Sequence, residues 1–241
     1  EFEETFISAF RSLEDLAKAS RKVLKTCHSS IGIGPSAIEG FDPNSWSIVA
    51  GDGLDISERY VLALRVLSMA ERSMEKRILE LTEIARRCEA EATFTLEREK
   101  DKSLWKRVEE YPSLSSDKFS LRCKVSTLIS RVGEVMNFTR KVSEKHVLQH
   151  SANAHLGLGI LHIYLNSDHP DELLEAVEEL RNYVLDIGSA SSLIVESAPL
   201  SVKERIDVWG PVRKDFFLME AIKNRFDPKG ILNPGRFIGG I

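Results

Sequence analysis

Cysteine is scarce in this chain, because only Cys27, Cys88 and Cys123 occur among 241 residues, and they lie far apart. No two of them have the CxxC spacing, which argues against a disulfide framework and against a thiolate zinc site. A reducing compartment suits such a chain, and we therefore expect it in the cytoplasm.

A surplus of positive charge is also missing. Lysine and arginine total 33 against 37 acidic residues, and the net charge of −4 gives no electrostatic reason to expect a nucleic-acid partner. Strongly apolar stretches, such as residues 61–67 and 156–165, are shorter than the roughly 20 residues that a spanning helix needs. We therefore expect no nucleic acid and no membrane span.

An initiator methionine and a signal peptide are missing too, since the sequence opens on Glu1. This opening is typical of the interior of a longer protein, and we expect an excised domain. With 42% hydrophobic residues, a chain of this length can bury a substantial core.

Short segments with strand character alternate with amphipathic helical segments. Strands are expected at residues 4–10, 60–67, 92–96 and 119–125 and within 147–165, and helices at residues 12–25, 71–87, 102–110, 128–140, 170–186 and 212–225. Because the strands carry polar as well as apolar residues, we expect an α+β fold, in which a ferredoxin-like antiparallel sheet has helices packed on one face.

Two histidines, His155 and His162, flank two glycines in one predicted strand region. Residues seven apart lie about 23 Å from each other in a strand and about 10 Å in a helix, so neither arrangement brings both rings to one ion. Gly157 and Gly159 permit a bend between them, and a bend would allow both to bind one metal through bonds of about 2 Å.

Glu196 is a candidate third ligand, because a carboxylate within the apolar residues 192–199 needs a partner. The alternative is that His162 is a hydrogen-bonded core histidine, His155 a loop residue and Glu196 a surface charge at the end of a strand.

Arginine side chains are the candidate ligands for an anionic substrate. Arg122 and Lys124 alternate with Cys123 on a predicted strand and so share a face, and Arg107 lies near the end of the preceding helix. A guanidinium offers paired donors that match a carboxylate. The alternative is that each is a solvated surface cation.

Two tightly specified turns end the chain. In residues 227–230, Asp-Pro-Lys-Gly, proline presets φ for a type I turn, and in residues 233–236, Asn-Pro-Gly-Arg, glycine occupies the position that needs a positive φ in a type II turn. The apolar pair Ile231-Leu232 separates them. The chain is therefore expected to leave its last helix along a fixed path.

Residues 226–237, Phe-Asp-Pro-Lys-Gly-Ile-Leu-Asn-Pro-Gly-Arg-Phe, resemble the C-terminal end of FAD-linked oxidases of the vanillyl-alcohol-oxidase type. Together with residues 195–210, they are most similar to the FAD-binding subunit of glycolate oxidase. The resemblance implies that residues 1–209 form a substrate or cap domain. It also implies that residues 210–241 form a helix and tail that return to an N-terminal FAD domain, with the cofactor-binding Asn233 beside the flavin.

The related D-lactate and D-2-hydroxyglutarate dehydrogenases hold a divalent metal with a His-x-Gly-Asp-Gly-Asn-Leu-His motif and a later Glu-His-Gly. His155, His162 and Glu196 match the metal positions, and the resemblance places Arg122, and more loosely Arg107, at the substrate carboxylate. The chain departs from the pattern at Leu158, Ile160, Tyr164 and Ser197, which stand where those enzymes have Asp, Asn, Asn and His. Since Ser197 replaces the histidine that acts on the hydroxyl proton, the resemblance names no general base in this chain.

The resemblance implies the cap of an FAD-dependent oxidoreductase that oxidises a 2-hydroxyacid such as glycolate or D-lactate, with the fragment alone inactive. The alternative is a non-catalytic assembly subunit of a glycolate oxidase complex. In either case the resemblance implies sister flavin and iron–sulfur subunits as partners, through which the protein would associate with a membrane. A free-standing metal-binding domain is a third hypothesis.

Overall fold

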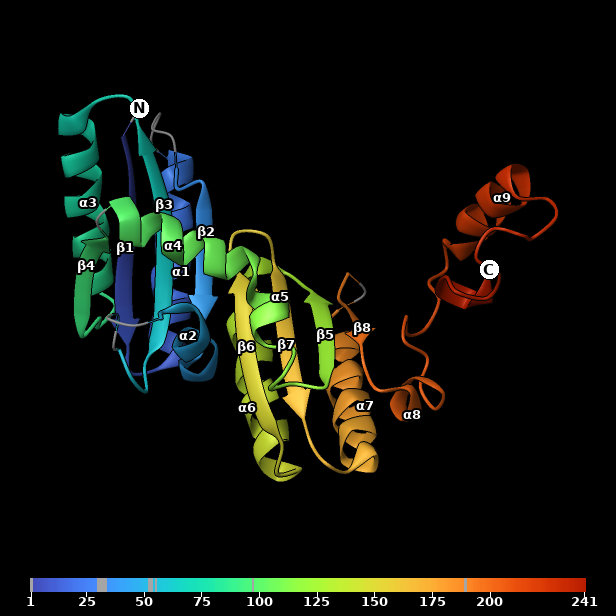
Figure 1. Ribbon diagram of the computed structural model, residues 1–241. Coiled ribbons are helices and arrows are strands. Elements are labelled where there is room, and N and C mark those ends of the chain that lie inside the picture. Colours follow the sequence, from blue (N-terminus) through green and yellow to red (C-terminus); the bar gives the residue numbers. More distant parts are fainter. Residues whose placement is uncertain (1, 30–33, 52–53, 55, 97, 189) are drawn as a thin grey trace.

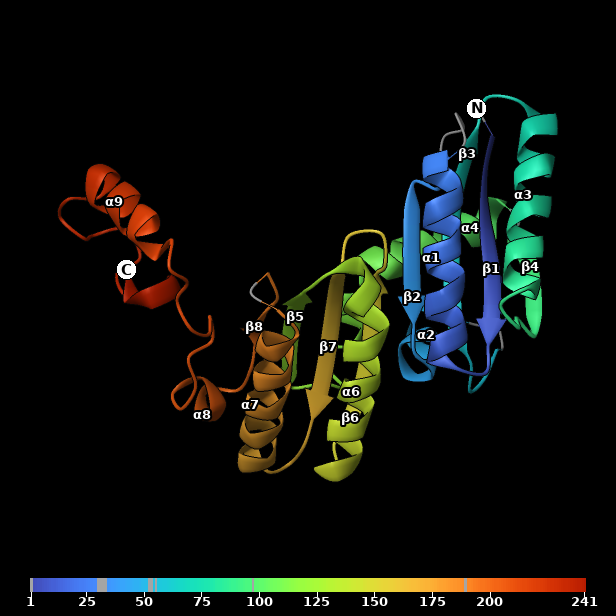
Figure 2. The ribbon, with the colours of Figure 1, turned by 180° about the vertical axis from the view of Figure 1, so that it is seen from behind.

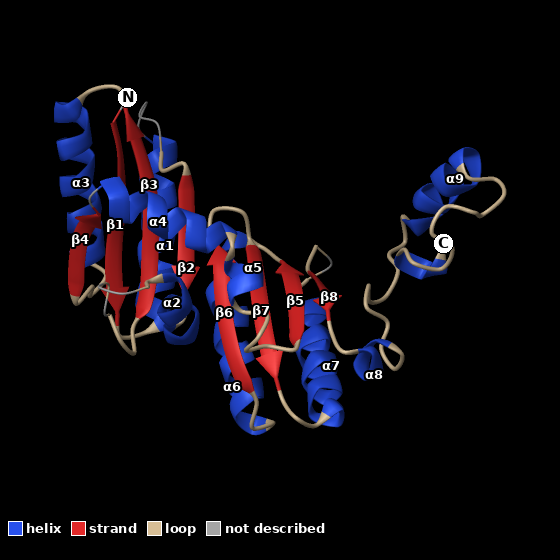
Figure 3. Cartoon of the chain, in the orientation of Figure 1, coloured by secondary structure: helices blue, strands red, loops and turns tan. Residues whose placement is uncertain are grey.

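The computed structural model describes residues 2–29, 34–51, 54, 56–96, 98–188 and 190–241 (Figures 1 and 3). The strands are β1 (Phe2–Phe10), β2 (Ala37–Phe41), β3 (Tyr60–Ser68), β4 (Ala92–Leu96), β5 (Leu121–Ser126), β6 (Gln149–His155), β7 (Ile160–Asn166) and β8 (Ser192–Ser197). The helices are α1 (Leu13–Ser29), α2 (Pro43–Val49), α3 (Glu71–Arg86), α4 (Arg98–Glu109), α5 (Tyr111–Leu114), α6 (Val132–Lys145), α7 (Pro170–Ile187), α8 (Leu200–Lys203) and α9 (Phe216–Phe226), with 3₁₀ turns η1 (Ile129–Arg131) and η2 (Ile238–Gly240).

The strands form one eight-stranded sheet in the order β4-β1-β3-β2-β6-β7-β5-β8, and every neighbouring pair is antiparallel. This order resolves into two repeats, β1-α1-β2-β3-α3-β4 and β5-α6-β6-β7-α7-β8, each with the βαββαβ connectivity of a ferredoxin-like unit. The α+β class is therefore confirmed. The sheet consists of two such units joined edge to edge.

Helices cover both faces of this sheet. The larger layer contains α1, α3, α6 and α7 (Figure 2), and buried residues such as Phe6 and Cys123 point into the core beneath it. The short helices α2, α4 and α5 cover part of the other face (Figure 1), where a smaller core includes Ile7 and Trp46. The expectation of helices on one face thus describes the larger layer and omits the smaller one. None of the helices in the described ranges has the length and apolar character to cross a membrane.

The two repeats meet at a short seam between β2 and β6, where three residue pairs are in register: Glu39–His155, Gly40–Ala154 and Phe41–Asn153. Asp42 extends this seam, because its N–H donates to Ala152 O at 3.0 Å and its carboxylate accepts from Ala152 N at 2.8 Å. The carboxylate also accepts from Ser45 N at 2.6 Å and so caps α2, which begins at Pro43. Asp42 therefore ties α2 and both repeats together.

The C-terminal segment stands away from the sheet (Figure 1), and α9 has no buried residue. Its path is nonetheless fixed, because Asp227 accepts N–H groups from Ile231 at 3.0 Å and Leu232 at 2.9 Å. Gly230 N donates to Asp227 O, and Arg236 N donates to Asn233 O, which closes the two predicted turns. Both turns are confirmed.

Candidate functional site

Polar side chains gather on one face of the second repeat and continue across the seam. On β5, Leu121, Cys123 and Val125 point into the larger core, and the intervening Arg122 and Lys124 point to the opposite face. The predicted shared face of these two cations is confirmed. We name the following set the polar face: Glu39, Arg122, Lys124, Asn153, His155, His162, Tyr164 and Glu196.

A hairpin brings the two histidines of the polar face together. His155 ends β6, β7 begins at Ile160, and the ring centroids of His155 and His162 lie 5.5 Å apart in an edge-on arrangement. Gly159 has a φ of 72°, and a Cβ there would lie 2.1 Å from Thr127 O. The chain therefore makes the bend that the glycines permit, and at Gly159 no other residue would fit.

Glu39 reaches His155 across the seam. Its Oε1 lies 2.8 Å from His155 Nδ1, and the residue is only 6% exposed. Burial raises the pKa of Glu39 above its ordinary range, although the hydrogen bond with His155 opposes that shift. The same hydrogen bond raises the pKa of His155.

His162 has a different environment, in which Nδ1 lies 3.6 Å from Glu196 Oε2. Burial lowers the pKa of His162, and the charge of Glu196 opposes the shift. The pKa values of the two histidines therefore move in opposite directions. Because of this difference, His155 holds a proton more readily than His162 does.

Arg122 is engaged on two sides. Its Nε lies 2.9 Å from Glu196 Oε2, an ion pair without hydrogen-bond geometry, and its charge opposes the rise in the pKa of Tyr164. Glu196 belongs to a β-bulge, since Arg122 pairs with Ser197 whereas Cys123 pairs with Val195. A β-bulge changes the direction in which a side chain points, and this bulge places Glu196 beside Arg122.

Tyr164 closes one end of the polar face with an aromatic cluster. Its ring packs edge-on against Tyr111 at a centroid distance of 4.9 Å and lies 6.1 Å from Phe119. Burial raises the pKa of Tyr164 to about 12. Its hydroxyl therefore remains protonated at neutral pH and can donate a hydrogen bond.

Several buried polar atoms of this face have no hydrogen-bond partner. They are Glu39 Oε2, Arg122 Nε, Asn153 Oδ1 and His162 Nδ1. Buried polar atoms in folded proteins are nearly always paired with protein, water or ligand. A cluster of four such atoms on adjacent strands marks this face as the candidate binding site.

The polar face does not match a metal centre in its present geometry. Among the described residues, no three His, Cys, Asp or Glu side chains gather closely enough to hold an ion. His155 Nδ1 is engaged by Glu39, and the cation of Arg122 lies against Glu196. The ligand set His155, His162 and Glu196 comes together on one face but stays a prediction.

The other two predicted site residues lie elsewhere. Arg107 donates from Nη2 to Ile48 O at 2.6 Å and from Nε to Val49 O at 3.1 Å, so it caps the end of α2. Asn233 lies in the C-terminal segment with a φ of 49°. Their substrate-binding and cofactor-binding roles stay predictions, although the contacts of Arg107 give it a structural role.

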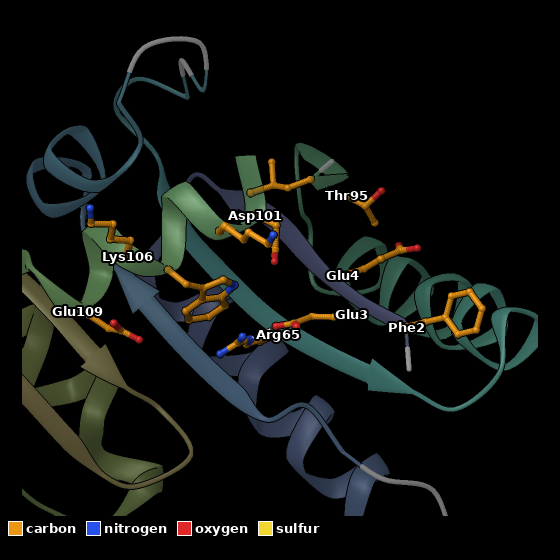
Figure 4. Close-up of a pocket in the computed structure, with 11 residues that line it drawn as sticks. Phe2, Glu3, Glu4, Arg65, Thr95, Asp101, Lys106 and Glu109 are labelled. Atoms are coloured by element: carbon orange, nitrogen blue, oxygen red, sulfur yellow. Dashed lines mark hydrogen bonds and ion pairs between the residues drawn. The ribbon is translucent and has the colours of Figure 1, made fainter. Parts of the chain in front are cut away.

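A hollow of about 710 Å³ beside α4 is separate from the polar face (Figure 4). Arg65 lies over the ring of Trp105 at 5.7 Å. Trp105 Nε1 donates to Thr5 Oγ1, which in turn donates to the buried Asp101. These contacts fix α4 to β1, and none of the predicted site residues lines this hollow.

The sequence reading missed Glu39 and Asn153 as site residues. Both lie next to the β2–β6 seam, and β2 is absent from the predicted strands. The signal that could have located this region is Asp42-Pro43, an N-cap residue followed by proline, which marks a helix start directly after a short strand.

The family described as FAD linked oxidases, C-terminal domain, matches residues 1–196 and 212–237. The structure of 4-ethylphenol oxidase from Gulosibacter chungangensis in complex with isoeugenol is similar, with a TM-score of 0.63 and 17% identity over 97% of this chain and 53% of that one. This identity shows the fold alone, and the chain spans about half the length of that oxidase. FgChi7B, with a TM-score of 0.46 and 8% identity over 94% of this chain and 54% of that one, is too dissimilar to support an argument. No curated protein sequence matches the chain.

Proposed function

Because the chain belongs to the FAD linked oxidases, as their C-terminal domain, we propose that it caps the flavin of an oxidoreductase whose substrate is a 2-hydroxyacid such as glycolate or D-lactate. The bound flavin supplies the hydride acceptor. The residues of this chain supply the binding and orientation of the substrate. An N-terminal domain of the full-length protein would bind most of the FAD.

The observation that supports this proposal is the set of buried atoms on the polar face that lack a hydrogen bond. Three of them have only ion-pair contacts, Glu39 Oε2 with His155, and Arg122 Nε and His162 Nδ1 with Glu196. A substrate with a carboxylate and a neighbouring hydroxyl has both acceptors and a donor to offer them. Arg122 is the residue proposed to bind the carboxylate, since a guanidinium presents paired donors. His155 and His162 lie on the adjoining strands, where the hydroxyl end would lie.

The exposed C-terminal segment supports the second half of the proposal, a docked FAD domain. Large apolar side chains are exposed here: Phe217, Leu218, Met219, Ile222, Phe226, Ile231, Leu232 and Phe237. So many exposed apolar side chains in one short segment are typical of an interface. We propose the FAD domain as its partner, with the turn at Asn233 returning beside the flavin.

Anaerobic reduction of the full-length protein tests the proposed function. The purified protein should be yellow, and the flavin absorbance should bleach when the right hydroxyacid is added. Arg122→Ala should lower kcat/KM about 10- to 100-fold, because a hydrogen bond to a charged group contributes about 1.5–3 kcal/mol. Arg205→Ala is the matched control, since Arg205 is exposed and pairs with Asp171. Absence of bleaching with every small hydroxyacid would refute the proposal.

A second candidate function is the non-catalytic assembly subunit of a glycolate oxidase complex. The observation that favours it is the engagement of Arg122, whose charge is balanced by Glu196 at 2.9 Å. A substrate carboxylate would have to displace Glu196, which costs binding energy. In this case sister flavin and iron–sulfur subunits perform the oxidation.

Two variants, Arg122→Ala and Glu196→Ala, separate the two candidates. An assembly subunit predicts that Glu196→Ala and Arg122→Ala leave turnover of the assembled complex unchanged. A catalytic subunit predicts a large fall for Arg122→Ala, and Glu196→Ala would free the guanidinium for the substrate and lower KM.

A further inference from the structure

Glu39 is the one member of the polar face that comes from the first repeat, whereas the others lie on β5, β6, β7 and β8. It is directly opposite His155 in the β2–β6 register. The two residues are 116 positions apart in the chain. The seam therefore brings a carboxylate from one ferredoxin-like unit to an imidazole of the other.

The contact between them has the geometry of a hydrogen bond rather than a loose ion pair. Glu39 Oε1 lies 2.8 Å from His155 Nδ1, and the side chain of Glu39 is 8% exposed against 34% for His155. An ionised carboxylate is an acceptor only, so Nδ1 is the donor whenever Glu39 is ionised. The neutral ring then has its lone pair on Nε2.

We propose that Glu39 is a positioning residue of the active site, which holds His155 as the Nδ1–H tautomer so that Nε2 is available to accept a hydrogen bond from the substrate hydroxyl. This inference rests on the proposed function and names a further residue of the same site. A carboxylate behind an imidazole commonly fixes both its tautomer and the orientation of its ring.

The partly exposed position of His155 agrees with this role. The second ring nearby, His162, is buried more deeply, with a side-chain exposure of 20%, and it lies next to Glu196. His155 is therefore the histidine of the pair that a molecule on the polar face can reach more easily. Glu39 is too deeply buried for a molecule on the polar face to reach, so it would act through His155.

Histidine nitrogen spectroscopy on the full-length, flavin-loaded protein tests the proposal directly. A long-range ¹H–¹⁵N correlation, recorded at an alkaline pH where the ring is neutral, should show His155 protonated at Nδ1. The His155→Gln variant assigns the signals. Glu39→Leu has a similar volume and removes the acceptor, so we expect a mixture of tautomers or the Nε2–H form. Glu39→Gln keeps a carbonyl oxygen as acceptor and should retain the wild-type tautomer.

Kinetics provide the second readout. Glu39→Leu should lower kcat/KM for the hydroxyacid about 10- to 100-fold, as loss of a residue that orients a site histidine typically does, and Glu39→Gln should recover most of the loss. Glu204→Leu is the matched control, since it removes an exposed carboxylate. The flavin content and melting temperature of each variant distinguish a folding defect from loss of orientation.

An Nδ1–H tautomer that persists in Glu39→Leu would overturn the proposal, and so would unchanged turnover in that variant. The nitrogen spectrum requires no substrate. If no hydroxyacid reduces the flavin, the proposed function fails, whereas the spectrum still decides whether Glu39 orients His155.

Discussion

Asp42 should make the stability of this domain depend on pH in a direction opposite to that of an ordinary salt-bridged carboxylate. The residue is 4% exposed, and burial raises its pKa to about 7, which outweighs the N–H groups of Ser45 and Ala152 that its oxygens accept. In the unfolded chain the pKa returns to the ordinary value of 3.8. Folding therefore favours the protonated form.

The direction and size of the pH effect on stability follow from the difference between the folded and unfolded pKa values of Asp42. A group whose folded pKa is raised contributes stability that is fully present below the unfolded pKa and is lost as the pH rises through the folded pKa. The shift from 3.8 to about 7 corresponds to about 4 kcal/mol at 1.36 kcal/mol per unit. This contribution should therefore disappear between about pH 4 and pH 8.

Comparison with Asp42→Asn isolates the contribution, because asparagine keeps one acceptor oxygen and cannot ionise. We would measure urea unfolding of both proteins across this pH range by tryptophan fluorescence, since the buried Trp46 lies in the helix that Asp42 caps. The free energy of unfolding of the wild type minus that of Asp42→Asn should fall by about 4 kcal/mol as the pH rises. Asp171→Asn, which changes an exposed carboxylate, should give a flat difference.

If the difference in the free energy of unfolding between the wild type and Asp42→Asn did not change with pH, burial would not shift the pKa of Asp42. A difference that rises with pH would show that the N–H groups of Ser45 and Ala152 stabilise the ionised form more than burial destabilises it. Either result would refute the reasoning.

Three further predictions concern packing, thiol reactivity and metal binding. Gly40→Val should destabilise the protein by about 1–3 kcal/mol, because a Cβ there would lie 2.7 Å from Leu156 Cδ1. Gly157→Ala, whose Cβ would lie 3.7 Å from Ile38, should change the free energy of unfolding in urea little. If both variants lost the same stability, the close approach of Gly40 to Leu156 would not be the cause. Cys88 and Cys123 are fully buried, and burial raises the pKa of Cys123 to about 12. Iodoacetamide should therefore leave both thiols unmodified until urea unfolds the chain, which mass spectrometry can check. Rapid alkylation of the folded protein would count against this packing. The ligand set His155, His162 and Glu196 predicts one divalent ion per chain after incubation with zinc or manganese and its loss in His162→Ala, and elemental analysis without bound metal would remove that set.

The elements that the sequence predicts well are those with a strong local pattern. On β5 apolar and polar residues alternate from Leu121 to Ser126, and this period of two marks both the strand and its two faces. Helix α7 begins at Pro170 with acidic residues in its first turn and ends before Gly188, and each of these signals is local. Such elements carry their signals within their own residues.

The elements that the sequence reading missed are short and depend on distant partners. Strand β2 has five residues, including Glu39 and Gly40, and it forms because β3 and β6 pair with it on either side. Helix α2 has seven residues and is held by Asp42 and by Arg107 of α4. Tertiary pairing therefore overrides weak local propensity at the seam.

The candidate site shows the same division. The glycines predicted that His155 and His162 could meet, and alternation predicted that Arg122 and Lys124 share a face. No local pattern indicates that Glu39 would take Nδ1 of His155, because that contact exists only after the two repeats join. Residue types can therefore be predicted here, whereas the partner of each donor atom cannot.

Glu39 and Asp42 lie on the same short seam, so the position of one depends on the contacts of the other. Three residue pairs and the side chain of Asp42 align β2 with β6, and the distance from Glu39 to His155 depends on that alignment. A slip of one residue would turn Glu39 to the opposite face of the sheet, into the core beneath α1 and α6. The contacts of Asp42 with Ala152 therefore stabilise the register on which the orientation of His155 depends, although Asp42 itself lies outside the polar face.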